Sequence, residues 1–419
     1  MTNTAELYLT QTDLAAEYRR VRAETERICA LLQTDDYQLQ SIVETSPPKW
    51  HIAHVSWFFE AFVLPEFIPS YRPFHPQFAY LFNSYYETVG SMHPRPQRGL
   101  LSRPTVEEVY RYRAHVDEQM LELIDAVEDR HWQDLAFRVT LGLNHEQQHQ
   151  ELLFMDTKHN FSVNPLHPAY SEHLQPAGQG AHSLRWIERP GGLLEIGHRG
   201  EGFAYDNETP RHKVLVQDHR LASRPVSNGE FLAFVEDGGY TRPELWLSDA
   251  WSLVKREGWQ HPLYWQREAG QWHQFTLGGM RRLNLDEPVC HLSFYEADAY
   301  ARWAGKRLPS EAELELMLAE QPVSGNFVDS SRLHPQPGDG QWYGDVWEWT
   351  ATPYAPYPGF RPLAGSMGEY NGKFMCNQMV LRGGSCLTPT GHMRPSYRNF
   401  FYPHDRWPMT GLRLAEDAV

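Results

Sequence analysis

The segments SPPKWHIAHVSWFFE (46–60) and LGLNHEQQHQELLFMD (141–156) decide the fold of the first part of the chain. Each carries apolar and aromatic residues at helical spacing, and a Pro-Pro pair near the start of the first segment favours a helix start. We therefore predict a four-helix bundle over residues 1–164, in which the Pro-rich stretch 65–104 forms one long crossover. The expected helices lie near residues 12–32, 49–64, 105–127 and 133–155.

The chain changes character near residue 180, where short strand-like segments replace long helical ones. Gly-Gly turns, Pro turns and Trp-rich segments recur from there onward, and only two clear helices are expected, near 227–236 and 294–304. This pattern predicts a loop-rich α+β domain over residues 185–419. A linker at 165–184 would join it to the bundle.

The composition disfavours several classes of protein. A length of 419 residues corresponds to two or three domains. The 38 basic and 53 acidic side chains give a formal charge of −15, which disfavours nucleic acids and anionic membrane surfaces as partners. The sequence shows no export signal and no apolar run of membrane-spanning length. Four widely spaced cysteines do not make a disulfide framework, so we expect a protein of the reducing cytoplasm.

Four histidines on two of the predicted helices indicate a metal site. His145 and His149 are four residues apart, so both imidazoles project from one helix face at a spacing that can hold one ion. Two solvated histidines would be the alternative, but His51 and His54 lie on an otherwise apolar and aromatic helix. Bundles commonly build metal sites from inward side chains of facing helices. One histidine of the second helix and the pair on the fourth would supply three nitrogen ligands.

The same segment also reads as H-E-x-x-H, the zinc metalloprotease motif, with Glu146 as the general base. The extended form of that motif requires Gly at the position of Leu152 and His at the position of Met155. A downstream carboxylate ligand such as Glu172 would lie in the Pro/Gly-rich linker, where no helix holds it. The sequence therefore disfavours a protease, which stays as a remote alternative.

The second half contains motifs that, in this order after the two histidine helices, are similar to those of one enzyme family. They are GGLLEIG (191–197), DNETPRHKVLV (206–216), PVSNGEFLAFVEDGGY (225–240), WAGKRLPSEAE (303–313), GDVWEWTATPY (344–354), VLRGGSC (380–386) and TGLRLA (410–415). Nearly the whole chain resembles the iron-dependent sulfoxide synthases of ergothioneine biosynthesis. Those enzymes fuse a DinB-like bundle to a C-type-lectin-like domain of the formylglycine-generating-enzyme type.

The resemblance implies a metal centre and a reaction. The ligand histidine of the second helix would be His54, which together with His145 and His149 would hold Fe(2+), while His51 would lie outside the ligand set. Such a facial set leaves room for O₂ and substrate. The family joins the sulfur of cysteine or γ-glutamylcysteine to C2 of the imidazole of hercynine, a trimethylated betaine, and oxidises that sulfur to a sulfoxide. Hercynine, a cysteine-type thiol and O₂ are thus the expected partners.

The resemblance also assigns substrate residues on the crossover. Tyr85 and Tyr86 resemble a tyrosine pair that lies beside the iron in some members, where a phenol can supply a proton. Arg95 and Arg98 match the family's pair that binds the donor carboxylate, a role suited to guanidinium groups. Solvated arginines and packing tyrosines are the alternatives.

Three further residues are expected to contact hercynine. Phe400 and Phe401 lie in the C-terminal segment that would form an aromatic cage for the quaternary ammonium, a cation without hydrogen-bond donors. Gln148, next to His149, could hydrogen-bond the hercynine imidazole.

Other activities fit the sequence less well. Formylglycine-generating enzymes use a pair of cysteines near the RGGS segment, whereas no second cysteine follows Cys386. A sugar-binding module would leave the histidines unexplained. A selenoneine synthase, which takes selenium from a selenosugar, has the same ligand set and is the closest alternative, although Arg95 and Arg98 favour a donor with a carboxylate.

Overall fold

The computed structural model describes residues 10–175, 178, 180 and 182–418. These residues divide into two compact units. The helical unit contains the described residues up to Asn164 together with two later segments, Gly200–Asp206 and Pro362–Gly372. The mixed unit contains the rest of the described chain. Two short pieces of the second half of the sequence therefore pack with the helices of the first half.

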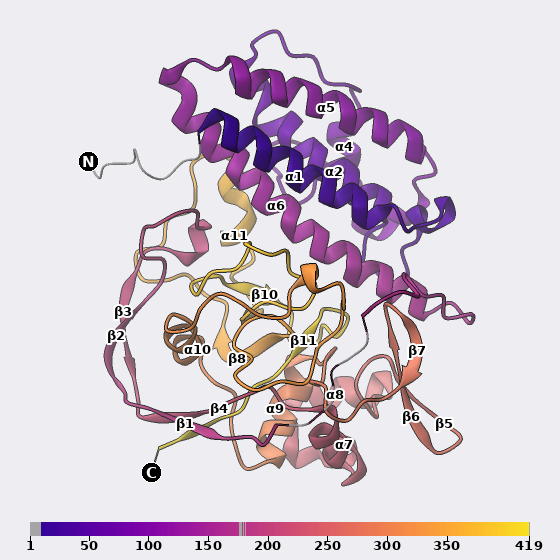
Figure 1. Cartoon of the computed structure of the whole chain (residues 1–419), viewed down its shortest axis with the longest axis vertical. Coiled ribbons are helices and arrows are strands. Elements are labelled where there is room, and N and C mark those ends of the chain that lie inside the picture. Colours follow the sequence, from indigo (N-terminus) through magenta and orange to yellow (C-terminus); the bar gives the residue numbers. More distant parts are fainter. Residues whose placement is uncertain (1–9, 176–177, 179, 181, 419) are drawn as a thin grey trace. The chain divides into compact units, whose positions relative to one another are not determined.

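Four long helices build the helical unit (Figure 1). They are α1 (Gln11–Cys29), α2 (Pro48–Phe62), α5 (Val106–Ala126) and α6 (Asp129–Ser162). Helix α2 packs on α5 and α6, and α1 packs on the same two helices. The predicted bundle is confirmed, and the largest difference is in α6, whose 34 residues extend past both ends of the predicted helix.

Helix α2 forms the centre of this bundle. Every residue of α2 except Ala61 is buried, and the buried residues include polar side chains such as Lys49, Ser56 and Glu60. Pro48 occupies its first turn, where a missing N–H costs nothing. At the start of α5, Thr105 and Glu108 form a reciprocal capping box. The crossover between α2 and α5 contains the short helices α3 (Leu64–Phe67) and α4 (Phe78–Phe82) and a 3₁₀ turn, η3 (Arg95–Leu100).

The mixed unit contains four small sheets (Figure 1). The central sheet has the order β10-β9-β8-β11, in which β11 is parallel to β8 and the other pairs are antiparallel. Its strands are β8 (Trp347–Pro353), β9 (Met379–Arg382), β10 (Asn399–Phe401) and β11 (Thr410–Gly411). The others are antiparallel: β1 (Trp186–Arg189) with β4 (His219–Ala222) and β12 (Ala415–Asp417), β2 (Gly192–Ile196) with β3 (His212–Val216), and β5 (Trp265–Glu268) with β6 (Gln271–Thr276) and β7 (Gly279–Arg282).

The expectation of only two clear helices in the second half is wrong. Helices α7 (Asn228–Glu236) and α9 (Phe294–Trp303) lie where they were predicted. The structure adds α8 (Ser248–Glu257) and α10 (Glu311–Leu318), besides a four-residue turn, α11 (Glu369–Gly372). Helix α10 has only eight residues, too few for a clear apolar period, but its capping box was visible in the sequence PSEAE.

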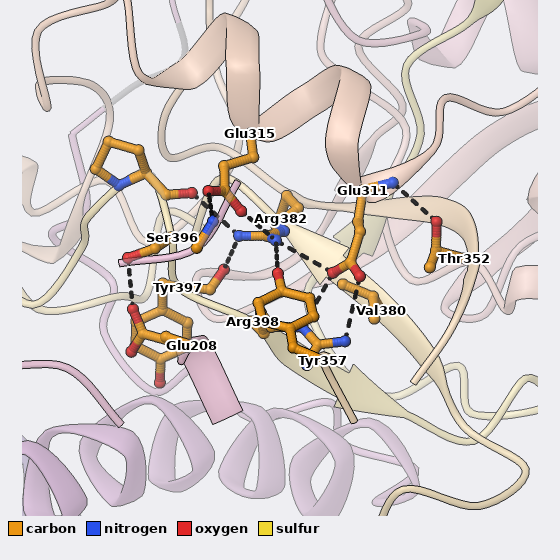
Figure 2. Close-up of polar contacts among 12 residues, drawn as sticks. Glu208, Glu311, Glu315, Thr352, Tyr357, Val380, Arg382, Ser396, Tyr397 and Arg398 are labelled. Carbon is orange, nitrogen blue, oxygen red and sulfur yellow. Dashed lines mark hydrogen bonds and ion pairs between the residues drawn. The ribbon is translucent and has the colours of Figure 1, made fainter. Parts of the chain in front are cut away.

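A buried ionic cluster joins α10 to β9 inside the mixed unit (Figure 2). The guanidinium of Arg382 donates to Glu315 at 2.8 Å and to Glu311 at 3.1 Å. Arg398 donates to the same oxygen of Glu311 at 3.0 Å and to its second carboxylate oxygen at 3.2 Å. Arg382 is the arginine of the RGGS segment, so this motif links the sheet to a helix through charge pairs.

The expected linker at 165–184 is only partly described, because residues 176–177, 179 and 181 lie outside the described residues. Its first part is anchored, since the backbone N–H groups of Tyr170 and Ser171 both donate to the carbonyl of Leu277. Among the described residues, none of the helices has the length and apolar character needed to cross a bilayer.

Candidate metal centre

Three histidine side chains meet where α2 and α6 cross. His54 of α2 lies against His145 and His149 of α6, with ring centroids 4.6 to 4.9 Å apart. One nitrogen of each ring lies within 4.8 Å of the others. The structure therefore brings together the three histidines that the family resemblance selected.

The protonation of these rings suits metal binding. Nδ1 of His54 lies 2.6 Å from the carbonyl of Phe82, which can only accept, so Nδ1 carries the proton and Nε2 presents a lone pair. Burial lowers the pKa of His145 to about 4 and holds the pKa values of His54 and His149 well below the usual range. All three rings are neutral imidazoles at neutral pH, the form that coordinates metals.

The spacing of the nitrogens also fits an ion. Nε2 of His54 and Nε2 of His145 face each other at 3.2 Å. Two cis ligands at about 2.1 Å from one ion would stand about 3 Å apart. In addition, Nδ1 of His145 is buried and has no hydrogen-bond partner among the described residues, so no second bond turns its Nε2 away from the cluster. The residues present therefore fit a metal ion held by three imidazoles.

His51 lies beside the cluster but outside this set of three. Its Nδ1 is 2.8 Å from Nδ1 of His149, and its Nε2 is 2.9 Å from a carboxylate oxygen of Asp156. The same oxygen accepts the backbone N–H of Ser46 at 2.8 Å. His51 thus connects a buried carboxylate to one histidine of the cluster.

Glu146, the general base of the protease interpretation, is engaged elsewhere. Its carboxylate accepts hydrogen bonds from Arg22 at 2.9 Å, Arg113 at 2.7 Å and Thr25 at 2.6 Å, all on α1 or α5. Burial alone would raise its pKa, but the Arg113 and Arg22 guanidinium groups outweigh burial and hold the pKa of Glu146 at about 2. Because this carboxylate binds α1 and α5 while the histidines meet α2, the geometry contradicts a role as the base of a zinc protease.

Arg98 lies near the histidines and forms no ion pair with any described carboxylate. It is 4% exposed, and its guanidinium donates to the hydroxyls of Ser46 and Ser84, both at 3.0 Å. It covers the indole of Trp50 at 3.5 Å, and the same indole stacks on His54 with centroids 4.5 Å apart. Among the described residues no carboxylate pairs with it. Burial and the neighbouring Arg95 lower the pKa of Arg98 to about 9, so it remains a cation at neutral pH.

Arg95 and Tyr85, also on the crossover, contact each other. The Arg95 guanidinium donates to the hydroxyl of Tyr85 and to the backbone carbonyl of Glu44. Tyr85 has a left-handed backbone with φ of 69°, an uncommon conformation for a residue with a bulky side chain. The amide of Asn83 donates to the carbonyls of Tyr86 and Gly90 and so holds this turn.

A small pocket opens beside His145 within the helical unit. Tyr86 and Gln148 line it, so the structure places both of these predicted residues next to the histidines. Burial raises the pKa of Tyr86, which keeps its phenol protonated. The complete lining comprises Phe58, Tyr86, Leu141, His145, Gln148, Tyr205, Asp206, Leu363, Met367, Tyr370 and Asn371.

Part of this pocket was not anticipated from the sequence. The ring of Tyr370 lies 6.4 Å from the ring of His145, and Asp206 accepts the side-chain amide of Asn371 at 2.7 Å. The carboxylate of Glu369 accepts the backbone N–H groups of Glu87 and Thr88, both at 3.0 Å. These residues belong to the two segments that join the helical unit from far along the chain. No local pattern in the sequence indicated that placement.

The structure places the two predicted cage residues on β10 of the mixed unit. Phe400 stacks on Tyr354 with centroids 4.1 Å apart and lies 5.9 Å from Phe374. Phe401 meets Trp407 edge to face at 5.4 Å. Both phenylalanines are partly exposed, so each offers ring surface beyond these contacts.

Comparisons with known proteins cover both units. The family model of the DinB superfamily matches residues 17–153, and that of the sulfatase-modifying factor enzyme 1-like domain matches residues 185–337 and 334–418. The hercynine oxygenase of Mycolicibacterium smegmatis is 31% identical over 94% of this chain and 96% of its own length. The hercynine oxygenase of Mycobacterium tuberculosis is 31% identical over 96% of this chain and 98% of its own length.

Relatives of the second half alone are also found. The formylglycine-generating enzyme of Streptomyces coelicolor is 29% identical over 60% of this chain and 95% of its own length. None of the four cysteines, all within the described residues, forms a disulfide, and Cys386 of the RGGSC segment is buried. Similarity to the hercynine oxygenases, by contrast, spans both units. The chain therefore belongs to the hercynine oxygenase family, with a DinB-type helical unit and a second unit of the sulfatase-modifying-factor type.

Proposed function

We propose that this protein is an Fe(II)- and O₂-dependent sulfoxide synthase of ergothioneine biosynthesis. One observation carries the proposal: three neutral imidazoles converge beside a buried guanidinium that forms no ion pair with any described carboxylate. The three imidazoles are a ligand set for iron, and the guanidinium is a receptor for an anion. The proposed reaction consumes hercynine, a thiol and O₂, and it yields the C–S-linked sulfoxide and one water.

The electrons of this reaction balance without another reductant. Two electrons leave when the C2–H bond of hercynine and the S–H bond are replaced by the C–S bond. Two more leave when the sulfur becomes a sulfoxide, and O₂ accepts all four. Zinc has no accessible second oxidation state, so the same three histidines would need iron for this chemistry.

We assign His54, His145 and His149 as the iron ligands. Bound Fe(II) would supply open coordination positions at which dioxygen and the two substrates can meet. The hydrogen bond from His54 to Phe82 fixes one ligand ring, and burial keeps all three rings neutral. The surrounding aromatic residues Trp50, Trp57 and Phe58 exclude water from the ligand side of the site.

We assign Arg98, with Arg95 beside it, to the carboxylate of the sulfur donor. A buried guanidinium that has only two hydroxyl partners retains donors for a carboxylate. A selenosugar has no carboxylate, so this cation favours an amino-acid thiol as the donor. The stack of Arg98 on Trp50 and of Trp50 on His54 would keep that carboxylate a short distance from the metal.

The reaction also needs a proton donor near the metal, and we assign this role to the phenols at the pocket. Tyr86 lines the pocket beside His145, and Tyr370 faces the same histidine. Burial raises the pKa values of both phenols, so each holds its proton at neutral pH and can deliver it during the reaction. Tyr85, whose hydroxyl accepts a bond from Arg95, is the third candidate.

Hercynine would be recognised by groups of a different kind. Gln148 lies in the pocket next to His145, where its amide can hydrogen-bond an imidazole. Phe400 and Phe401 offer partly exposed ring faces for the trimethylammonium group. The four cysteines outside disulfides suit our placement of the reaction in the reducing cytoplasm.

Anaerobic reconstitution tests the proposal. The purified chain would be loaded with Fe(II), mixed with hercynine and one donor, and exposed to O₂, and the products identified by mass spectrometry. Cysteine, γ-glutamylcysteine and a selenosugar would be the three donor arms. We expect a sulfoxide with a cysteine-type donor, and loss of iron and turnover in His54→Ala, His145→Ala and His149→Ala. Product only in the selenosugar arm would replace the proposal by a selenoneine synthase, and turnover in zinc-loaded, iron-free protein would overturn it.

A further inference from the structure

The pair formed by His51 and Asp156 has no role in the function proposed above. Both side chains are buried, at 2% exposure each, and they are 105 residues apart in sequence, on the different helices α2 and α6. A buried charge and a buried imidazole each cost free energy unless their hydrogen bonds are satisfied. Their contacts therefore require an explanation beyond packing.

The direction of each hydrogen bond can be derived from the chemistry of the partners. An aspartate carboxylate only accepts, and the same Asp156 oxygen also accepts the N–H of Ser46. Nε2 of His51 must therefore carry the proton in the 2.9 Å bond to Asp156. In its neutral form His51 has one N–H, so its Nδ1 is then an acceptor. Among the described residues, the group that can donate to it is Nδ1 of His149, at 2.8 Å.

This chain of bonds decides the tautomer of His149. With the proton on Nδ1, the lone pair of His149 lies on Nε2. We propose that Asp156 and His51 are positioning residues that hold His149 in the Nδ1–H tautomer and fix its ring plane, so that Nε2 is presented to the metal. The inference rests on the proposed metal centre for its purpose, but the tautomer itself does not depend on a metal.

The three histidines of the cluster are held in different ways. The hydrogen-bonded chain from Asp156 through His51, called the relay below, reaches His149. His54 is fixed by a backbone carbonyl, whereas none of the described groups hydrogen-bonds Nδ1 of His145. Within the described part of the cluster, His149 alone is connected through a second ring to a carboxylate. Partners of this kind raise the basicity of a ligand and fix its orientation.

The first test reads the tautomer without iron. Side-chain ¹⁵N NMR of histidine-labelled apoprotein distinguishes a protonated from an unprotonated Nδ1, and the resonances of His149 are assigned by comparison with His149→Gln. We expect His149 to carry its proton on Nδ1. In His51→Phe, which keeps a ring but removes the acceptor, Nε2–H should appear. An Nε2–H tautomer in the unaltered protein would overturn the proposal without any variant.

The second test measures Fe(II) affinity under anaerobic conditions by competition with a chelator. We expect Asp156→Asn and His51→Phe to weaken binding by about 10- to 100-fold. The matched control is Glu60→Gln. It neutralises a different buried carboxylate, which lies on α2 and accepts hydrogen bonds from Tyr71 and Tyr112 rather than from a histidine. It should change the affinity by no more than about 2-fold.

The outcomes separate the relay from the proposed function. Equal affinities in Asp156→Asn and Glu60→Gln, with an unaltered His149 tautomer, would reduce the pair to packing. An unaltered protein that shows the expected tautomer but binds no Fe(II) would instead refute the iron centre and leave the tautomer assignment standing.

Discussion

Gly142 of α6 lies so close to Phe59 of α2 that a Cβ carbon on this glycine would stand 2.5 Å from Cε1 of the ring. The Phe58 ring limits the same space at 3.0 Å. Gly142 is one turn before His145, so the contact sets how closely the two histidine-bearing helices approach. We expect Gly142→Ala to lower the free energy of unfolding by about 1–3 kcal/mol, since overpacking outweighs the better helix propensity of Ala. Urea unfolding and iron content would measure both effects.

A double-mutant cycle provides the control for that experiment. Phe59→Leu removes the ring that the new methyl group would meet, so the double variant should recover part of the loss. An additive result would show that Gly142 is required for another reason than this contact.

Glu146 should behave as a structural residue. Glu146→Gln removes the charge that pairs with Arg22 and Arg113 in the interior, and breaking such a network costs about 3 kcal/mol or more. We expect a lower urea midpoint with no specific effect on any peptidase activity. Zinc-dependent peptide hydrolysis that disappears in Glu146→Gln at unchanged stability would restore the protease interpretation.

Removing the phenol hydroxyls should redirect the reaction. With Tyr86→Phe or Tyr370→Phe the rings and the pocket remain, so iron and substrates should still bind. We expect the product ratio to move from the sulfoxide toward cysteine sulfinate, measured by mass spectrometry against O₂ consumption. Tyr85→Phe, measured in the same way, would show whether the hydrogen bond between Arg95 and the Tyr85 hydroxyl contributes to catalysis. An unchanged ratio in all three variants and in their combination would leave these tyrosines as packing residues.

Arg98→Met keeps a long apolar side chain on Trp50 but removes the charge. We expect the KM for the thiol to rise by about 10- to 100-fold, as for the loss of a charged hydrogen bond, with the KM for hercynine nearly unchanged. Arg95→Met should act in the same direction. Arg103→Met, an exposed arginine on the same crossover, is the control and should match the unaltered protein. Equal losses for both substrates would contradict a receptor for the donor carboxylate.

Asp345 should give the mixed unit a measurable pH dependence. Burial raises its pKa to about 6, although Asn326, Gln341 and the backbone of Gln336 donate to it. The folded state therefore binds the proton more tightly than the unfolded state, and stability falls as pH rises from about 4 to 6 and then levels off. Relative to Asp345→Asn, the unaltered protein should lose about 2–3 kcal/mol over this range. Parallel stability profiles from pH 4 to 7 would contradict the shift.

The bundle and the three histidines could be predicted from sequence because their signals are local. Each helix has its own apolar period, and His145 and His149 share one face by their spacing alone. The choice of His54 over His51 came from family resemblance, since both lie on the same helix and differ only in what they meet across the bundle. Tyr370 had no local signal, because its place beside His145 depends on a segment about 200 residues away in sequence.

The route of the chain through the helical unit has a consequence for how this enzyme can be altered. The proposed ligands are encoded before residue 165, whereas Gly200–Asp206 and Pro362–Gly372 supply one wall of the pocket. One wall of the pocket and all of the proposed metal ligands are thus encoded in separate stretches of the chain. A chimera that exchanges only residues 362–372 with a relative would reshape the wall and leave every proposed ligand in place, while a fragment cut at residue 164 would keep the ligands and lose that wall.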